Sequence, residues 1–112
     1  MKLYFYVLNQ DIKTDEWKLC VEECDVVEKP KTYKPVTRFP SGLYLGSFIK
    51  KESIGHFVGN WKEIIVLDRP DYKKAKEIFF KKYDREIRML KSKISSYELF
   101  KKAIENYEDD ES

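Results

Sequence analysis

The first part of the chain carries short apolar runs in the patterns of β-strands. Segment 3–8 is rich in aromatic and β-branched residues and ends at a polar stretch, which is typical of a strand followed by a loop. In segment 17–21, apolar residues alternate with polar ones. We expect these strands to pair antiparallel, with a β-bulge at 22–23 that would shift the apolar register before Val26 and Val27.

The middle of the chain predicts a connector, a turn and further strands. Segment 29–35 contains two prolines, which lack an amide donor, so we expect an extended connector and not a central strand. The sequence FPSG at 39–42 fits a β-turn that leads into a third strand at 43–45. Residues 59–60, Gly-Asn, suit a two-residue hairpin loop before the apolar strand 64–67, which we place at the sheet centre.

A long helix is predicted after these strands. Asp68 can act as its N-cap, Pro70 suits a first helical turn, and the charge of Asp71 suits the positive end of the helix dipole. From there to Tyr107 the chain contains neither Gly nor Pro. Its many Lys, Glu, Ala, Leu and Ile residues are compatible with one continuous helix.

Together these elements predict an α+β fold. The 112 residues have room for one domain with a modest core. We expect a small antiparallel sheet of about four or five strands at 1–69, a long coiled-coil-forming helix at 70–107 and an acidic tail at 108–112. Hydrophobic residues make up 42% of the chain, which supports folding, and the 38% of charged residues suggest a heavily solvated exterior.

The predicted helix carries an apolar stripe with the alternating three- and four-residue spacing of a coiled coil. About 36 helical residues would extend about 54 Å, whereas a domain of this size has a radius of gyration near 13 Å, so the sheet cannot cover the whole stripe. We therefore predict an interface, most simply a homodimer. The apolar positions are Phe80, Tyr83, Ile87, Leu90, Ile94, Tyr97 and Ile104, and Lys101 occupies the remaining core position.

The residues that flank this stripe bear on how two helices would pair. In a parallel pair, Glu86 would face Lys91 of the second chain. Lys93 would likewise face Glu98, so both pairings are attractive. An antiparallel pair remains open. The alternative is a helix that breaks at 95–96 and folds back on the sheet as a helical hairpin.

A second predicted surface is basic. Between Tyr72 and Ile104 there are eleven Lys or Arg residues and four acids, although the net charge of the chain is only +2. Basic and aromatic side chains together are typical of phosphate-binding surfaces, and they also suit acidic partners. The alternative is a solvated helix face and a lysine-protected sheet edge. The residues concerned are Lys29, Lys31, Tyr33, Lys34, Arg38, Arg85 and Arg88.

The sequence offers little material for catalysis. His56 is the sole histidine, and no glycine-flanked serine or nucleotide-binding glycine loop accompanies it. We expect 53–56 to form a turn in which the imidazole bonds a backbone carbonyl. In a strand, Cys20 and Cys24 would lie about 13 Å apart, beyond disulfide reach, and one histidine cannot complete a zinc site with them. We therefore expect structural thiols and no enzyme activity, metal or cofactor.

The cellular location follows from the absence of sorting signals. The longest uncharged apolar run, 3–8, is far shorter than the roughly 20 residues that span a bilayer. The N-terminus also lacks the basic region, long apolar stretch and cleavage site of a signal peptide. We expect a cytoplasmic protein without a membrane partner.

The stretch from 29–35 through 39–42 and on to 53–55 resembles small uncharacterised proteins carried by bacteriophages and prophages. The resemblance covers under a third of the chain and includes no motif of known role, so it implies no catalytic residues. Proteins of this type commonly bind and block host machinery, including bacterial defence systems. The resemblance implies a non-enzymatic inhibitor or adaptor. Its partners would be a second copy and a host protein, with nucleic acid as the alternative.

Overall fold

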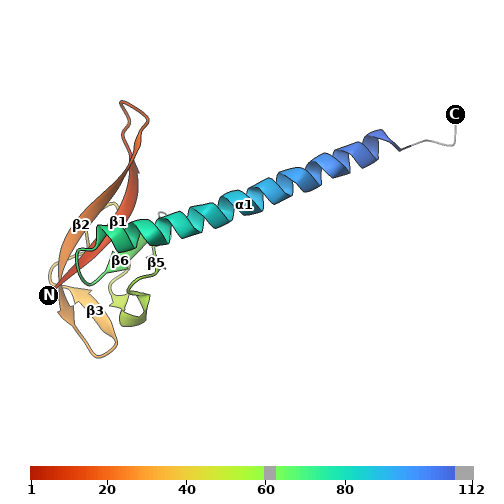
Figure 1. The fold of residues 1–112 in the computed structure, drawn as a ribbon. Helices are drawn as coiled ribbons and strands as arrows, with labels where there is room; N and C mark the ends of the chain where they lie inside the picture. Colours follow the sequence, from red (N-terminus) through yellow and green to blue (C-terminus); the bar gives the residue numbers. More distant parts are fainter. Residues whose placement is uncertain (60–62, 108–112) are drawn as a thin grey trace. The chain divides into compact units, whose positions relative to one another are not determined.

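The computed structural model describes residues 1–59 and 63–107 and shows an antiparallel sheet followed by a long helix (Figure 1). The chain divides into two compact units, residues 1–75 and the remainder from Lys76 onward. The elements are β1 (Lys2–Gln10), β2 (Trp17–Glu28), β3 (Thr32–Pro35), β4 (Ile49–Lys50), a 3-10 turn (Lys51–Ser53), β5 (Phe57–Val58), β6 (Ile64–Leu67) and α1 (Tyr72–Glu105).

The predicted α+β class is confirmed. The sheet has six strands in the order β4-β3-β2-β1-β6-β5, and each neighbouring pair is antiparallel. It exceeds the four or five strands expected because β3 was predicted to be a connector and β4, with only two residues, is too short to produce a recognisable pattern. Strand β6 is fully buried between β1 and β5, but its predicted place at the sheet centre is wrong, because β1 and β2 form the middle of the sheet.

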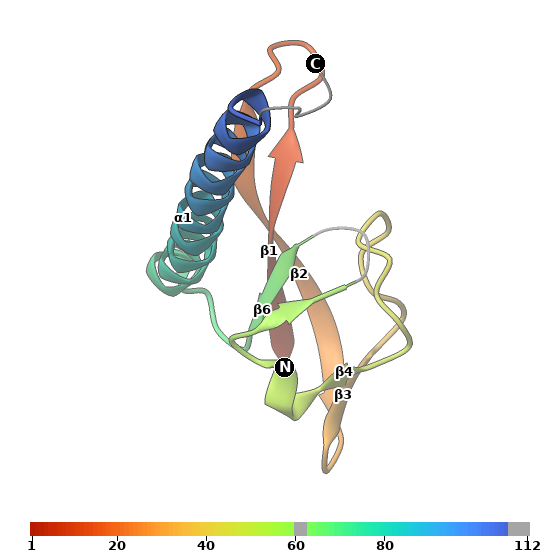
Figure 2. The same cartoon turned by 90° about the vertical axis from the view of Figure 1, so that its right-hand side faces the viewer.

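The predicted pairing of β1 with β2 is also confirmed, but the bulge at 22–23 is wrong. The register runs without interruption from Lys2 opposite Asp25 to Gln10 opposite Trp17. A shift is unnecessary because β2 uses both of its faces: Cys24 and Val26 are buried on the face opposite to that of the alternating residues 17–21. The hairpin ends of β1 and β2 extend past the shorter neighbouring strands (Figure 2).

Residues 32–35 of the segment 29–35 form strand β3 and not only a connector, which corrects the sequence-based prediction. The prolines did not prevent β3 from forming because they lie at its limits. Pro30 precedes the strand, and Pro35 is its last residue, opposite Val26. A missing amide donor is tolerated at these positions.

The third strand predicted at 43–45 is absent, and these residues form a loop. The turn expected before it is present at 41–42, where Gly42 has a φ of +87°. Leu43 is buried, but Tyr44 adopts a φ of +53°. This left-handed backbone cannot continue a strand.

The hairpin of β5 and β6 is present with a longer connection than predicted. Val58 lies opposite Ile64, so residues 59–63 join the strands, in place of a two-residue Gly59–Asn60 loop. Asn60 itself lies outside the described residues. The turn expected before this hairpin is present at 54–55, and His56 is exposed at its end.

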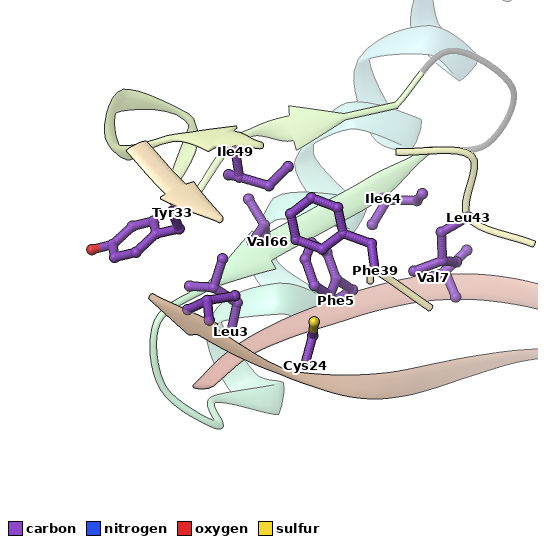
Figure 3. Packing of buried hydrophobic residues seen from close by; sticks show 11 residues of the cluster. Leu3, Phe5, Val7, Cys24, Tyr33, Phe39, Leu43, Ile49, Ile64 and Val66 are labelled. Atoms are coloured by element: carbon purple, nitrogen blue, oxygen red, sulfur yellow. The ribbon is translucent and has the colours of Figure 1, made fainter. Parts of the chain in front are cut away.

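The main core lies on one face of the sheet, under the loop that joins β3 to β4 (Figure 3). Phe39 from this loop meets Phe5 of β1 edge to face, with ring centroids 5.7 Å apart. Aromatic pairs prefer such edge contacts. The buried cluster consists of Leu3, Phe5, Val7, Cys24, Val26, Tyr33, Phe39, Leu43, Ile49, Ile64 and Val66.

The opposite face of the sheet packs against the beginning of α1. Tyr6 is completely buried there and meets Tyr72 edge to face at 5.0 Å between ring centroids. Ala75, one turn into the helix, is also completely buried. Because successive residues of a strand point to opposite faces, Phe5 and Tyr6 contribute to different sides of the sheet.

The N-cap of α1 is Asp71 and not Asp68. The backbone N–H of Lys74 donates to Asp71 Oδ1 at 3.0 Å, and that of Ala75 donates to the Asp71 carbonyl at 3.1 Å. Residues 68 and 69 instead form the bend that leaves β6. The helix then continues unbroken to Glu105, so the alternative of a break at 95–96 is wrong. Neither serine removes a backbone hydrogen bond, so the helix has no reason to end there.

Candidate functional site

The apolar stripe of α1 is exposed over most of its length. Six of the seven predicted interface residues are exposed, with fractions that range from 49% for Ile87 to 74% for Ile104. Tyr83 is half-buried, and its ring stacks on Phe79 with 6.3 Å between centroids. We call Phe80, Tyr83, Ile87, Leu90, Ile94, Tyr97 and Ile104 the seam.

The unbroken helix brings the seam residues onto one face. Positions three and four apart in an α-helix lie above one another, and the spacing holds from Phe80 to Ile104. Lys101 is the sole charged residue at a core position within this range. The helix therefore presents a continuous apolar stripe about 36 Å long, at 1.5 Å per residue.

Charges on this part of α1 are sorted by face. In the heptad that places the seam residues at the two core positions, every acid from Lys76 to Glu105 occupies one of the two positions that flank the core; these acids are Glu77, Asp84, Glu86, Glu98 and Glu105. The far face, on which Lys81, Lys82, Arg85, Arg88 and Lys102 lie, has no acid. The flanks of the seam therefore carry both signs, whereas the far face carries one.

Most of these charged side chains are exposed, and Lys82 is half-buried. Lys82 Nζ lies 3.9 Å from Glu86 Oε1 one turn away, and the Arg88 Nε–H donates to the Asp84 carbonyl at 3.4 Å. Exposed helical pairs of this kind stabilise a helix by only about 0.3–0.5 kcal/mol. The charges are thus available to a partner surface.

In the predicted basic segment of residues 1–75, the aromatic side chain of Tyr33 is not accessible to a ligand. Tyr33 is only 6% exposed, and Lys51 Nζ lies 5.5 Å from its ring centroid. The same ammonium group pairs with Glu28 at 2.8 Å. Tyr33 therefore belongs to the core and cannot stack on a base. The basic residues Lys29, Lys31, Lys34 and Arg38 are exposed, and Arg85 and Arg88 belong to the other compact unit.

The two cysteines are free thiols on one face of β2. Cys24 is buried, and burial raises its pKa, with a further contribution from the negative charge of Asp25. Its Sγ lies 3.5 Å from the Arg38 carbonyl oxygen. Cys20 is half-buried. Among residues 1–59 and 63–107, no three His, Cys, Asp or Glu side chains are grouped so that they could hold a metal ion.

An open groove borders the outer edge of β2. Its volume is about 630 Å³, and it is lined by residues 22–25 of the strand and 36–41 of the following loop. The strand contributes three acids to it, and the loop contributes Arg38. Sequence patterns did not indicate this groove because it depends on which strand lies next to β2.

Comparisons of the chain with protein families, with curated proteins and with solved structures gave no match. Within the described part of the chain, no helix is both long enough and apolar enough to cross a membrane. Because no family, curated protein or solved structure matches, the indications of function come from the surfaces described above.

Proposed function

We propose that this chain is a non-enzymatic protein-interaction protein that forms a homodimer by pairing the seam of α1 with that of a second copy. The observation that carries this proposal is the exposure of six large apolar side chains along one stripe. Removing a side chain of this size fully from water stabilises an assembly by about 1.5–3 kcal/mol. Monomers rarely expose contiguous apolar patches beyond a few hundred Å².

The identity of the residues favours a second copy as the partner. Ile87 and Ile94 occupy the first core position of their heptads and Leu90 the second, which is the combination preferred by parallel two-stranded coiled coils. The flanks also complement themselves. In a parallel pair, Glu86 meets Lys91 of the other chain, and the same spacing joins Lys93 to Glu98.

An antiparallel pair suits the charges less well. If two antiparallel helices overlapped with their midpoints aligned, Glu77 of one chain would lie beside Glu98 of the other. It would also place Lys101 opposite Lys76, twice per dimer. In the parallel pair both flank contacts are attractive, and the like-charge layers are Lys76 and Lys101, each against its own copy; a lysine at a core position is tolerated at some cost in stability.

The biological role that we propose is that of a phage-type inhibitor or adaptor in the cytoplasm. The resemblance of segments 29–42 and 53–55 to phage proteins supports this role. The helix would assemble the dimer, and the sheet unit would contact a host protein such as a component of a defence system. A tagged chain should then retain a specific protein from a bacterial lysate. Retention of nucleic acid alone would contradict the proposal.

Light scattering after size exclusion tests the assembly. We expect Leu90→Glu to halve the mass of the wild-type particle, because the substitution buries an unpaired charge in the seam. Leu99→Glu is the matched control: it makes the same change on the same helix at a residue that is 67% exposed and off the seam. A wild-type monomer, or a Leu90→Glu particle of unchanged mass, would show that the seam is not the interface.

The acid-free far face of α1 favours nucleic-acid binding as an alternative function. Phosphate contacts release counterions, so affinity must fall steeply as salt rises. Fluorescence anisotropy with a short labelled duplex between 50 and 200 mM KCl measures this slope. A steep slope that is reduced by Arg85→Glu together with Arg88→Glu would support the alternative, and a flat response would remove it.

A further inference from the structure

The outer edge of β2 is open along most of its length. Strand β3 pairs only with residues 26–28 of β2, and the next loop bonds to Asp25 through the N–H of Val36 at 2.9 Å. From Trp17 to Glu23, no described strand lies on the side of β2 that faces away from β1. Unpaired edges of this length are templates for strand addition.

The direction of each backbone group along this edge follows from two hydrogen bonds. The N–H of Val26 donates to the Met1 carbonyl at 2.9 Å, so Val26 points its hydrogen-bonding groups toward β1. Neighbouring residues alternate in direction, and the bond accepted by the Asp25 carbonyl from Val36 agrees with this. The N–H and C=O groups of Trp17, Leu19, Val21 and Glu23 therefore point outward, where no described residue bonds them.

We propose that this edge pairs with the same edge of a second copy, antiparallel and centred on Cys20. A two-fold axis at Cys20 sets Leu19 opposite Val21 of the other chain and Trp17 opposite Glu23. These are the residues with outward backbone groups, so each such pair can exchange two hydrogen bonds. Helix pairing through the seam is not required for this contact.

The side-chain charges select this register over its neighbours. With the two-fold axis at Lys18, the Lys18 residues of the two copies would lie opposite each other. With the axis at Glu22, the two Glu22 residues would do so. Like charges directly opposite each other destabilise a sheet. With the axis at Cys20, Lys18 lies opposite Glu22 of the second copy, twice. Axes at Leu19 or Val21 form no opposite-charge pair. A lysine normally protects an edge strand from pairing with another chain. In this register, however, Lys18 lies opposite Glu22 of the second copy.

Lys18 and Glu22 are free to make this contact. Within the chain, Lys18 lies opposite Asn9 and Glu22 lies opposite Phe5. No ion pair is found for either residue within the part of the chain that the structure describes. A charge reversal at either position therefore leaves the chain's own ion pairs unchanged.

Cysteine cross-linking tests the register. Opposed residues in a non-hydrogen-bonded pair have Cα atoms about 4.5 Å apart, within the roughly 4.4–6.8 Å range of disulfides. In a Cys24→Ser chain treated with diamide, which accepts the two hydrogens that the thiols lose, we expect a covalent dimer through Cys20. A Cys20→Ser chain that retains the buried Cys24 is the control and should stay monomeric on a non-reducing gel.

Charge reversal separates pairing from random collision. In the Cys24→Ser background, Lys18→Glu alone and Glu22→Lys alone should each slow cross-linking about tenfold or more, since two attractive pairs become repulsive. The double change Lys18→Glu with Glu22→Lys should restore the rate. Circular dichroism checks that each variant is folded. Absence of the covalent dimer, or equal rates in all four chains, would overturn the proposal.

Discussion

The side-chain oxygen of Tyr6 accepts a hydrogen bond from the backbone N–H of Asp71 at 2.8 Å, and this contact joins strand β1 to the N-cap residue of α1. Tyr6 is completely buried in the middle of β1. Asp71 lies 65 residues later and begins α1. The start of the helix is therefore held by the sheet as well as by its own cap.

Loss of the Tyr6 hydroxyl should weaken this junction. Tyr6→Phe keeps the ring packed against Tyr72 and leaves the Asp71 N–H without its partner. We expect a loss of about 1–3 kcal/mol in the free energy of unfolding, measured by urea denaturation, because a buried donor becomes unsatisfied. Tyr4→Phe, a neighbouring half-buried tyrosine in the same strand, is the control. An unchanged stability would show that water replaces the hydroxyl.

The same residue should make stability fall at high pH. Burial raises the pKa of Tyr6 above its ordinary value of about 10. The folded chain therefore resists the loss of this proton, so stability is fully present below pH 10 and is lost as the pH rises toward the folded-state pKa. Urea midpoints measured from pH 8 to 11 should decline less in Tyr6→Phe than in the wild type.

Replacement of the helix cap should distinguish Asp71 from Asp68. Asp71→Ala removes the acceptor of the Lys74 N–H, which typically costs about 1 kcal/mol. Asp68→Ala alters an exposed residue in the preceding bend and should change the free energy of unfolding by less than about 0.5 kcal/mol. Equal losses in the two variants would contradict the observed cap.

The loop between β3 and β4 should contribute to the core like a regular element. Leu43 is almost fully buried, so Leu43→Ala should lower the free energy of unfolding by about 2–5 kcal/mol. The exposed Val36 in the same loop provides the control, since Val36→Ala removes little buried surface. A small effect at Leu43 would mean that the loop opens without disturbing the sheet.

Charge exchange along the seam should report the direction of helix pairing. Glu86→Lys is expected to weaken the dimer, and addition of Lys91→Glu should restore it if the helices are parallel. In an antiparallel pair, Lys93→Glu would be the restoring change instead. Sedimentation equilibrium of the three proteins measures the dissociation constants. The Lys82–Glu86 contact within the helix is lost in all three and cancels from the comparison.

Elements with strong local patterns were predictable from the sequence. The aromatic run of β1, the apolar run of β6 and the uninterrupted helix formers of α1 each define one structure without help from distant residues. The seam was also predictable, because its spacing and the helix continuity depend on local sequence alone. Six of its seven residues are exposed in the structure.

Features that depend on distant partners were not predictable. Strand β3 forms because Val26 to Glu28 of β2 pair with it, and nothing in its proline-bounded sequence indicates that partner. Asp71 replaces Asp68 as cap because Tyr6 fixes its N–H from across the molecule. The open edge of β2 likewise became visible only when the strand order was known.

Because α1 is unbroken, the alignment of its apolar stripe depends on the number of residues in the helix. Insertion or deletion of one residue within the helix would turn everything after it by about 100°, and the apolar stripe would be split between two sides. Seven inserted residues would restore the phase to within about 20°. Variants of this chain that keep a working helix should therefore differ in its length by whole heptads.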